Sequence, residues 1–167
     1  MLVALSDTHG ETGPRLTAHL ETVLRRASAV VHAGDFTTPA VLDAFASRAA
    51  VFAAVHGNRD TQAVTGRLPE TATLTWAGRR VAVVHGHRHD RTSLSLLARQ
   101  EGADVVVTGH THRQAVERAG EITVVNPGSH AEPRASRPGY ATFERTGEGG
   151  RCVLRGVQGD RVRAVDL

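Results

Sequence analysis

One pattern recurs along this chain of 167 residues: a short apolar run ends, and a residue able to bind a metal ion follows within a few positions. The plainest case is the β-branched run 105–107, which leads through Thr108 and Gly109 into His110 and His112. β-Branched runs of this length favour buried strands. The other residues of this kind that follow or end apolar runs are Asp7, His9, Asp35, Asn58, His85 and Asn126. The chain must therefore adopt a fold that tolerates many polar residues at the ends of buried strands.

Helix and strand patterns alternate over the first two-thirds of the chain. Apolar residues recur at helical spacing over 14–26, 39–45 and 93–101, with Gly102 as the expected C-cap of the last helix. The expected strands between and after these helices are 2–5, 29–32, 51–55, 71–76, 79–84, 105–107, 114–118 and 122–126. Turns at Ala77-Gly78 and Ala119-Gly120 indicate two hairpins.

Three further strands, 140–145, 151–157 and 161–165, follow as an antiparallel meander. This all-strand tail suggests a second sheet packed against the first. We therefore expect one domain over residues 1–167, with an α/β fold of two mixed β-sheets packed as a sandwich and flanked by helices.

Charge and hydropathy argue against two classes of partner. The isoelectric point is near 10.3, but the formal net charge is only +3, and all twenty basic residues are scattered arginines. Because nucleic acids attract clustered positive charge, we expect no dedicated nucleic-acid binding. No apolar run approaches the roughly 20 residues of a membrane span, so we also expect no membrane contact.

The first residues and the cysteine content favour a cytoplasmic protein. Met1 leads directly into the run 2–5 and then into Ser6 and Asp7, without the basic and long apolar regions of a secretory signal. The single cysteine, Cys152, cannot form an internal disulfide and fits a reducing compartment. We expect Cys152 to be a small buried strand residue.

The strand-end residues can be explained singly or as a group. Singly, each has a plain explanation, since Asp and Asn favour turns and a loop histidine is usually solvated. As a group they favour a shared site, because ligands of open α/β sheets bind outside the carboxyl ends of the strands. Histidines, carboxylates and a carboxamide supply enough ligands for two metal ions. Such a set suits Mn²⁺, Fe²⁺ or Zn²⁺, whereas a structural zinc site would be rich in cysteine.

The order and spacing of these motifs resemble those of the calcineurin-like metallophosphoesterases, in particular the small single-domain phosphodiesterases related to Vps29. The motifs that carry the resemblance are Asp7-Thr8-His9, Gly34-Asp35, Gly57-Asn58-Arg59-Asp60, His85-Gly86-His87 and Gly109-His110-Thr111-His112. The similarity covers roughly residues 1–130 and implies the four-layer α-β-β-α fold of that family.

The resemblance also implies two divalent metal ions as cofactors, with Mn²⁺ first and Fe, Zn or Ni as alternatives. The residues implied for one ion are Asp7, His9, Asp35 and His112. Those implied for the second are Asp35, Asn58, His85 and His110, so that Asp35 bridges the two. The implied reaction is phosphodiester hydrolysis by in-line attack of a hydroxide that bridges the metals.

Asn58, Arg59 and Asp60 are the expected catalytic residues. Asn58 supplies an oxygen ligand without a charge that would repel phosphate. Many relatives have histidine where this chain has Arg59, and arginine keeps its proton at ordinary pH, so it cannot be a general acid. Its planar group can instead bind phosphate oxygens. Three further residues are expected to support the metal ligands or contact substrate: His87, Asn126 and His130.

A second class of function stays open, because a fold does not fix a function. The alternative is a Vps29-like protein-binding scaffold with little or no catalytic activity. Since every implied metal position holds a competent ligand, the sequence favours the enzyme. The expected partner is a small phosphoester substrate, and a homo-oligomer is suggested by the resemblance alone.

Overall fold

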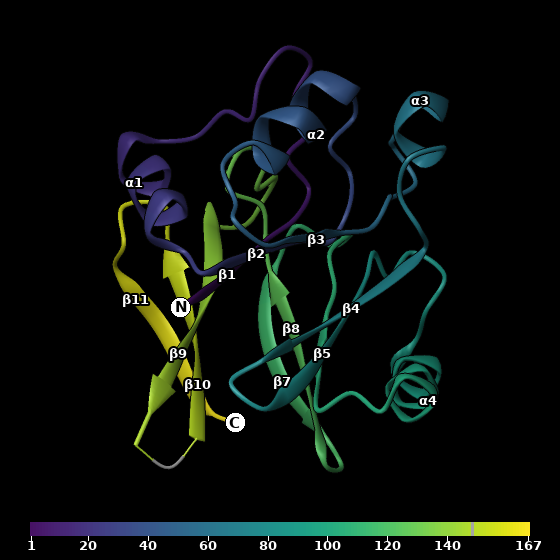
Figure 1. Cartoon of the computed structure of the whole chain (residues 1–167), viewed down its shortest axis with the longest axis vertical. Coiled ribbons are helices and arrows are strands. Elements are labelled where there is room, and N and C mark those ends of the chain that lie inside the picture. Colours follow the sequence, from purple (N-terminus) through teal and green to yellow (C-terminus); the bar gives the residue numbers. More distant parts are fainter. Residues whose placement is uncertain (148) are drawn as a thin grey trace.

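In a computed structural model of the chain, described over residues 1–147 and 149–167, two β-sheets stack face to face (Figure 1). The strands are β1 (Leu2–Leu5), β2 (Ala29–His32), β3 (Phe52–Ala54), β4 (Thr71–Trp76), β5 (Arg79–Val84), β6 (Val105–Val107), β7 (Gln114–Ala119), β8 (Ile122–Pro127), β9 (Gly139–Thr146), β10 (Gly149–Gly156) and β11 (Arg161–Asp166). The helices are α1 (Ala18–Arg26), α2 (Pro39–Ala46), α3 (Gln62–Thr65) and α4 (Arg91–Glu101).

Both sheets mix parallel and antiparallel pairing. The first has six strands in the order β11-β10-β9-β1-β2-β3, with β1 parallel to β2 and antiparallel to β9. The second has five in the order β4-β5-β6-β8-β7, with β5 parallel to β6 and antiparallel to β4. The expected sandwich of two mixed sheets is confirmed.

The alternating side chains of β1 enter two different cores. Leu2 and Ala4 lie in the core between the sheets. Val3 and Leu5 point the other way and belong to the cluster that packs against α1 and α2. A third cluster, which includes Ala98 of α4, lies on the outer side of the second sheet. Helices thus cover both outer faces, which gives the four layers that the resemblance implied.

The three C-terminal strands do not form the second sheet, and that expectation was wrong. β9 pairs antiparallel with β1, so that Leu2 lies opposite Phe143, and β10 and β11 extend the same sheet. The second sheet is built entirely from residues 71–127. Hydrophobic alternation fixes which face of a strand is buried, but it does not name the neighbouring strand.

The first helix begins later than its apolar spacing predicts. α1 starts at Ala18 and not near Pro14, because Arg15 has a φ of +53°, which a right-handed helix does not allow. The hydroxyl of Thr17 caps the helix by accepting the N–H of Leu20 at 3.1 Å.

The other helices differ less from expectation. α4 begins two residues before Ser93, because Asp90 and Ser93 form a capping box, and Gly102 closes it with a φ of +61° as expected. The short helix α3 lies between the expected strands 51–55 and 71–76, where no helix was expected. Within the described residues, no helix is both long and apolar enough to cross a membrane.

Cys152 lies buried on β10, where a small strand residue was expected. Burial raises the pKa of its thiol to about 12. The thiol therefore stays protonated at neutral pH and offers no nucleophile.

Two histidines are buried beneath α2. The ring of His32 stacks on Phe36 with centroids 3.8 Å apart, and the ring of His130 meets Phe45 edge-on at 6.1 Å. His130 Nε2–H donates to the carbonyl of Pro14 at 2.8 Å. Burial lowers the pKa of both imidazoles, that of His130 to about 4. Both rings are therefore neutral at pH 7.

Acid should destabilise the protein through His130. Its pKa falls from 6.5 to about 4 on folding, so the unfolded chain binds the proton first as the pH drops. Stability should be lost between these two pH values, by about 3 kcal/mol in full. His130→Gln keeps a donor for the Pro14 carbonyl but cannot titrate. The free energy of unfolding of this variant, measured in urea at several pH values, should therefore depend less on pH between 6.5 and about 4.

The matched control is His19→Gln, which removes a half-buried imidazole on α1. This variant should keep the acid-induced loss. A His130→Gln protein with the same slope as the unmodified chain would contradict the assignment.

Candidate metal centre

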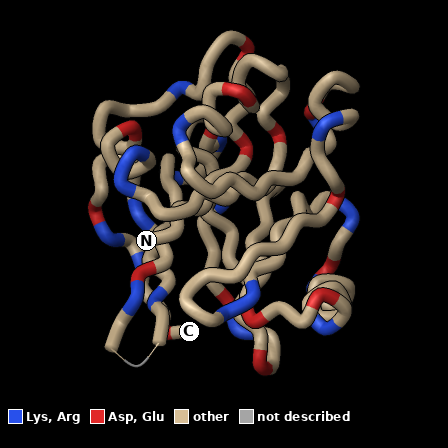
Figure 2. Tube along the Cα trace, viewed as in Figure 1, with Lys and Arg blue, Asp and Glu red and all other residues tan. Residues whose placement is uncertain are grey.

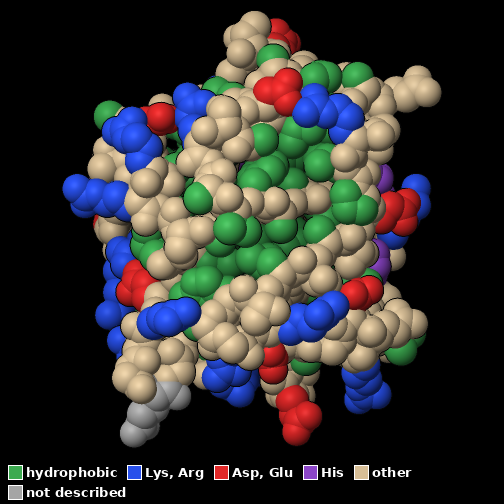
Figure 3. All heavy atoms as spheres, viewed as in Figure 1, with side chains coloured by type: hydrophobic (Ala, Val, Ile, Leu, Met, Phe, Trp, Pro, Cys, Tyr) green, Lys and Arg blue, Asp and Glu red, His purple; other side chains and the backbone are tan. Residues whose placement is uncertain are grey.

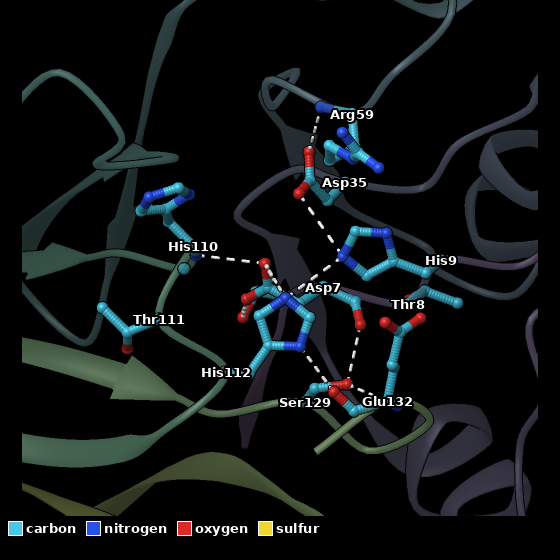
Figure 4. A network of polar contacts seen from close by, with 12 residues as sticks. Asp7, Thr8, His9, Asp35, Arg59, His110, Thr111, His112, Ser129 and Glu132 are labelled. Carbon is cyan, nitrogen blue, oxygen red and sulfur yellow. Dashed lines mark hydrogen bonds and ion pairs between the residues drawn. The ribbon is translucent and has the colours of Figure 1, made fainter. Parts of the chain in front are cut away.

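The ends of several strands meet at one end of the sandwich, and Figure 4 shows the side chains of Asp7, His9, Asp35 and His112 turned toward one another. Parallel pairing of β1 with β2 and of β5 with β6 brings their carboxyl ends together. The residues that follow these strands and β3 are Asp7, His9, Asp35, Asn58, His85, His110 and His112. The structure thus collects all seven implied metal ligands in one region.

Left-handed backbone is concentrated in this region. The expected ligands with φ between +46° and +68° are Asp7, His9, Asp35, His110 and His112. This conformation is uncommon for residues with a Cβ atom and costs of order 1–3 kcal/mol each. Strain gathered at one place indicates a functional site, because the surrounding structure must hold it there.

A first group of side chains surrounds the end of β1. Asp7, His9 and His112 each offer a ligand atom within 4.8 Å of the others. His9 Nε2 lies 3.2 Å from His112 Nε2 and 3.4 Å from Asp35 Oδ2, and His112 Nε2 lies 3.5 Å from Asp7 Oδ1. The four residues implied for one metal ion therefore converge.

A second group adjoins the first through Asp35. Asp7, Asp35 and His85 also offer ligand atoms within 4.8 Å of one another. Asp35 Oδ2 lies 3.4 Å from His85 Nε2, which equals its distance from His9 Nε2. Asn58 Oδ1 lies 3.1 Å from His85 Nε2 and 3.0 Å from His110 Nδ1. Asp35 thus lies between the two groups, and the Asp7 carboxylate belongs to both.

Two of the imidazoles are oriented by backbone carbonyls. His85 donates its Nδ1–H to the carbonyl of Ala33 at 2.6 Å, and His112 donates its Nδ1–H to that of Glu132. In the neutral rings each Nε2 then carries a lone pair that faces the carboxylates. This is the arrangement that metal-binding histidines adopt, so the donor set fits divalent metal ions.

Burial and neighbouring charges shift the pKa values of the site. Burial raises the pKa of Asp7 and lowers that of His9. For His85, burial lowers the pKa, but the contact with Asp35 outweighs it and raises the pKa overall. For Asp35, burial raises the pKa, but His85 and the Arg59 N–H outweigh it and lower the pKa. Asp35 is therefore the carboxylate best held in its charged form.

Asp60 holds the loops together through backbone N–H groups. Its Oδ2 accepts the N–H groups of Asp35 at 3.0 Å and Gly57 at 2.7 Å, and its Oδ1 accepts that of Thr37 at 2.7 Å. With all three bonds directed to backbone, Asp60 positions Asp35 and Asn58. This geometry supports a positioning role instead of the expected catalytic one.

Asn126 also acts through the backbone. Its Nδ2 donates to the carbonyl of Gly109 at 2.7 Å and to Thr111 Oγ1 at 3.0 Å, and its Oδ1 accepts the N–H of Gly128 at 2.8 Å. Asn126 thus fixes the loop that carries His110 and His112, which agrees with the expected support of the ligands.

The other expected residues divide between the rim of the site and the core. The Arg59 side chain is exposed, while its N–H donates to Asp35 Oδ1 at 2.8 Å. The His87 ring lies 5.4 Å from that of His85 and, with His56 and His89, lines a cavity of about 20 Å³. That volume accommodates about one water molecule. His130 lies in the core described above, so its position does not support a contact with substrate.

Two serines that the sequence did not single out hold Asp7. Ser6 Oγ–H donates to Asp7 Oδ2 at 2.8 Å, and Ser129 Oγ–H donates to the Asp7 carbonyl at 2.7 Å. Serine is a poor metal ligand, so a search for ligands passes over it. Their positions, directly beside Asp7 and directly after the Pro127-Gly128 turn, were the available signal.

The comparisons with known proteins agree with this arrangement. A family model described as the calcineurin-like phosphoesterase superfamily domain matches residues 1–148, so the chain belongs to that superfamily. A probable metallophosphoesterase of Methanothermobacter thermautotrophicus is 29% identical over 152 residues, covering 89% of this chain and 87% of the relative. The probable metallophosphoesterase YsnB of Bacillus subtilis is 32% identical over 144 residues, which cover 81% of this chain and 78% of the relative.

Solved structures of the same fold include Vps29 proteins. A Vps29 single mutant from Entamoeba histolytica has a TM-score of 0.80 at 22% identity, with 99% of this chain and 98% of that chain covered. A predicted phosphoesterase from Streptococcus pneumoniae has a TM-score of 0.77 at 23% identity. The match covers 99% of this chain and 97% of that chain. At such identities the similarity shows the fold alone.

A side chain at Gly57, the glycine before Asn58, should lower the stability of the protein. A Cβ atom on Gly57 would lie 2.1 Å from Asp35 Oδ1, so Gly57→Ala must displace that carboxylate. Overpacking of this kind typically costs about 1–3 kcal/mol. Urea unfolding should show this loss for Gly57→Ala. Gly13→Ala is the matched control, because nothing lies within 4 Å of its added Cβ. Equal stability of the two variants would contradict the tight packing around Asp35.

Proposed function

We propose that this chain is a phosphodiesterase that uses two divalent metal ions bridged by Asp35. The observation that carries the proposal is the position of Asp35 Oδ2, which lies 3.4 Å from imidazole nitrogens on both sides, His9 Nε2 and His85 Nε2. A carboxylate that lies between two groups of imidazoles is placed where its oxygens could bridge two metal ions.

The proposed ligands follow the two groups of side chains. One ion takes Asp7, His9, Asp35 and His112, and the other takes Asp35, Asn58, His85 and His110. Two ions bound in this way would acidify a shared water for in-line attack on phosphorus and would offset the charge of the phosphate. Mn²⁺ is the metal to test first, since the carboxylate and carboxamide oxygens of the set suit it.

The chain's own residues orient the substrate and the ligands. Asp60 and Asn126 fix the loops, and the backbone N–H of Arg59 holds one oxygen of Asp35. The Arg59 side chain is exposed at the rim of the site (Figure 4), from which its guanidinium can bind phosphate oxygens. We propose a small phosphoester as the substrate and the cytoplasm as the compartment, the latter because a single cysteine fits a reducing environment.

The Vps29-like neighbours favour a second candidate function, that of a protein-binding scaffold. A scaffold does not need strained backbone at five ligand positions or carbonyl-oriented imidazoles. These features support the enzyme. The two functions differ in one measurement, because a scaffold would leave phosphodiesters intact even with metal supplied.

Hydrolysis of bis-p-nitrophenyl phosphate should require Mn²⁺ and the Asp35 carboxylate. A chelator should abolish the activity, and added Mn²⁺ should restore it. Asp35→Asn should lower kcat/KM by at least about a hundredfold, because an amide bridges two cations poorly and mutations at such sites cost on the order of 3 kcal/mol or more.

The matched control is Asp43→Asn, which removes an exposed carboxylate on α2 that pairs with Arg67. Its activity should equal that of the unmodified chain. Metal-loaded protein that leaves the substrate intact would favour the scaffold.

Arg59 should matter for binding phosphate and not for protonating the leaving group. Arg59→Ala should raise KM about equally for activated and unactivated phosphodiesters, because a guanidinium contacts the shared phosphate oxygens. Arg59→His should raise kcat mainly for unactivated esters, since only their leaving groups need a proton. Steady-state kinetics on one ester of each kind tests this, and an equal effect of Arg59→His on both would contradict it.

A further inference from the structure

The segment 10–15, between β1 and α1, borders the candidate metal centre. A hollow of about 390 Å³ lies there, and the residues that line it are His9, Glu11, Thr12, Gly13 and Arg15. Because His9 Nε2 points to the carboxylate of Asp35, the hollow adjoins the first group of candidate ligands. Its volume lies within the range of small-molecule sites. A substrate group that extends from the metal centre past His9 therefore enters this hollow.

The backbone of this segment is fixed by other parts of the chain. Thr38 Oγ1–H donates to the carbonyl of Glu11 at 2.8 Å. The buried ring of His130 donates to the carbonyl of Pro14, also at 2.8 Å. Arg15, the next residue, is held in left-handed backbone with a φ of +53°. Strained backbone that its neighbours hold in place indicates a function for the side chains that it directs.

The side chains of Glu11, Thr12 and Arg15 are available to a ligand. All three residues are exposed, and their side chains form no hydrogen bond or ion pair with any residue that the structure describes. Figure 2 shows acidic and basic residues along the segment between β1 and α1. The apolar side chains in Figure 3 gather instead in the middle of the face, where β3 and β4 lie. The hollow thus offers a carboxylate, a hydroxyl and a guanidinium, which are donors and acceptors without a net charge.

Glu132 adds a second carboxylate beside His9. Figure 4 shows the Glu132 side chain extending toward the His9 ring. Burial lowers the pKa of His9, and the negative charges of Asp35 and Glu132 oppose that change, which agrees with a Glu132 carboxylate close to the ring. Two carboxylates repel an anionic ligand, but each accepts hydrogen bonds from hydroxyl groups.

We propose that the hollow beside His9 binds an uncharged arm of the phosphodiester that carries several hydroxyl groups, as a sugar or glycerol does. This inference rests on the proposed function and names the class of its substrate. Neighbouring hydroxyls both donate and accept, so they can donate to Glu11 and accept from Arg15 at the same time. An apolar arm would leave these groups without partners, and an arm with a second phosphate would face two carboxylates.

Calorimetric binding of three phosphomonoesters to the Mn²⁺-loaded full chain tests the proposal. Glycerol 1-phosphate should bind about tenfold more tightly than propyl phosphate, because the two differ only in the hydroxyl groups that the hollow would pair. 2-Aminoethyl phosphate, which carries a cation and no hydroxyl, should bind more weakly than glycerol 1-phosphate. Glu11→Ala should reduce the tenfold ratio between glycerol 1-phosphate and propyl phosphate to about threefold or less, since it removes an acceptor for the hydroxyls.

The control is Glu121→Ala, which removes an exposed carboxylate in the turn between β7 and β8 and should keep the tenfold ratio. Circular dichroism should show both variants folded. Equal binding of glycerol 1-phosphate and propyl phosphate, tighter binding of 2-aminoethyl phosphate, or a ratio that Glu11→Ala leaves unchanged would overturn the proposal. Failure of the proposed function is a separate result, because the protein would then leave bis-p-nitrophenyl phosphate intact while the binding ratios still report on the hollow.

Discussion

Two buried carboxylates set the problem that the rest of the structure solves. Asp7 is 0% exposed and Asp35 1% exposed, and their oxygens lie within 4.8 Å of the same imidazole. Neighbouring carboxylates out of water repel each other, and burial alone disfavours their charge. Imidazoles and backbone N–H groups surround them, among them the rings of His9, His85 and His112 and the N–H groups of Arg59 and His110. A site of this composition is stabilised by cations, which connects the fold to metal-dependent chemistry.

The loops that carry these groups are rigid because each is fixed by other parts of the chain. Asp60 binds three backbone N–H groups, Asn126 binds the loop of His110 and His112, and Ser129 binds the Asp7 carbonyl. These contacts hold the candidate ligands in left-handed backbone that they would not adopt alone. A preformed set of ligands does not need to reorganise when charge develops during a reaction. The parts remote from substrate thus contribute to the proposed activity.

The sequence predicted where the candidate ligands lie better than it predicted the residues that hold their loops. Strand ends can be recognised locally, so Asp7, Asp35, His85 and His112 were assigned to one region before the fold was known. Asp60 was expected to be catalytic from its place in the Gly57-Asn58-Arg59-Asp60 motif. Its contact with the backbone of Thr37 could not be foreseen, because it depends on a loop distant in sequence. The pairing of β9 with β1 was missed for the same reason, since strand neighbours are set by tertiary packing.

The most direct test of the account is a crystal structure of the Mn²⁺-loaded protein with anomalous scattering recorded near the manganese edge. The account predicts two peaks about 3.5–4 Å apart. Asp35 should lie between them, with His112 at one and His110 at the other. A single peak that binds both His110 and His112, or no peak at Asp35, would contradict it.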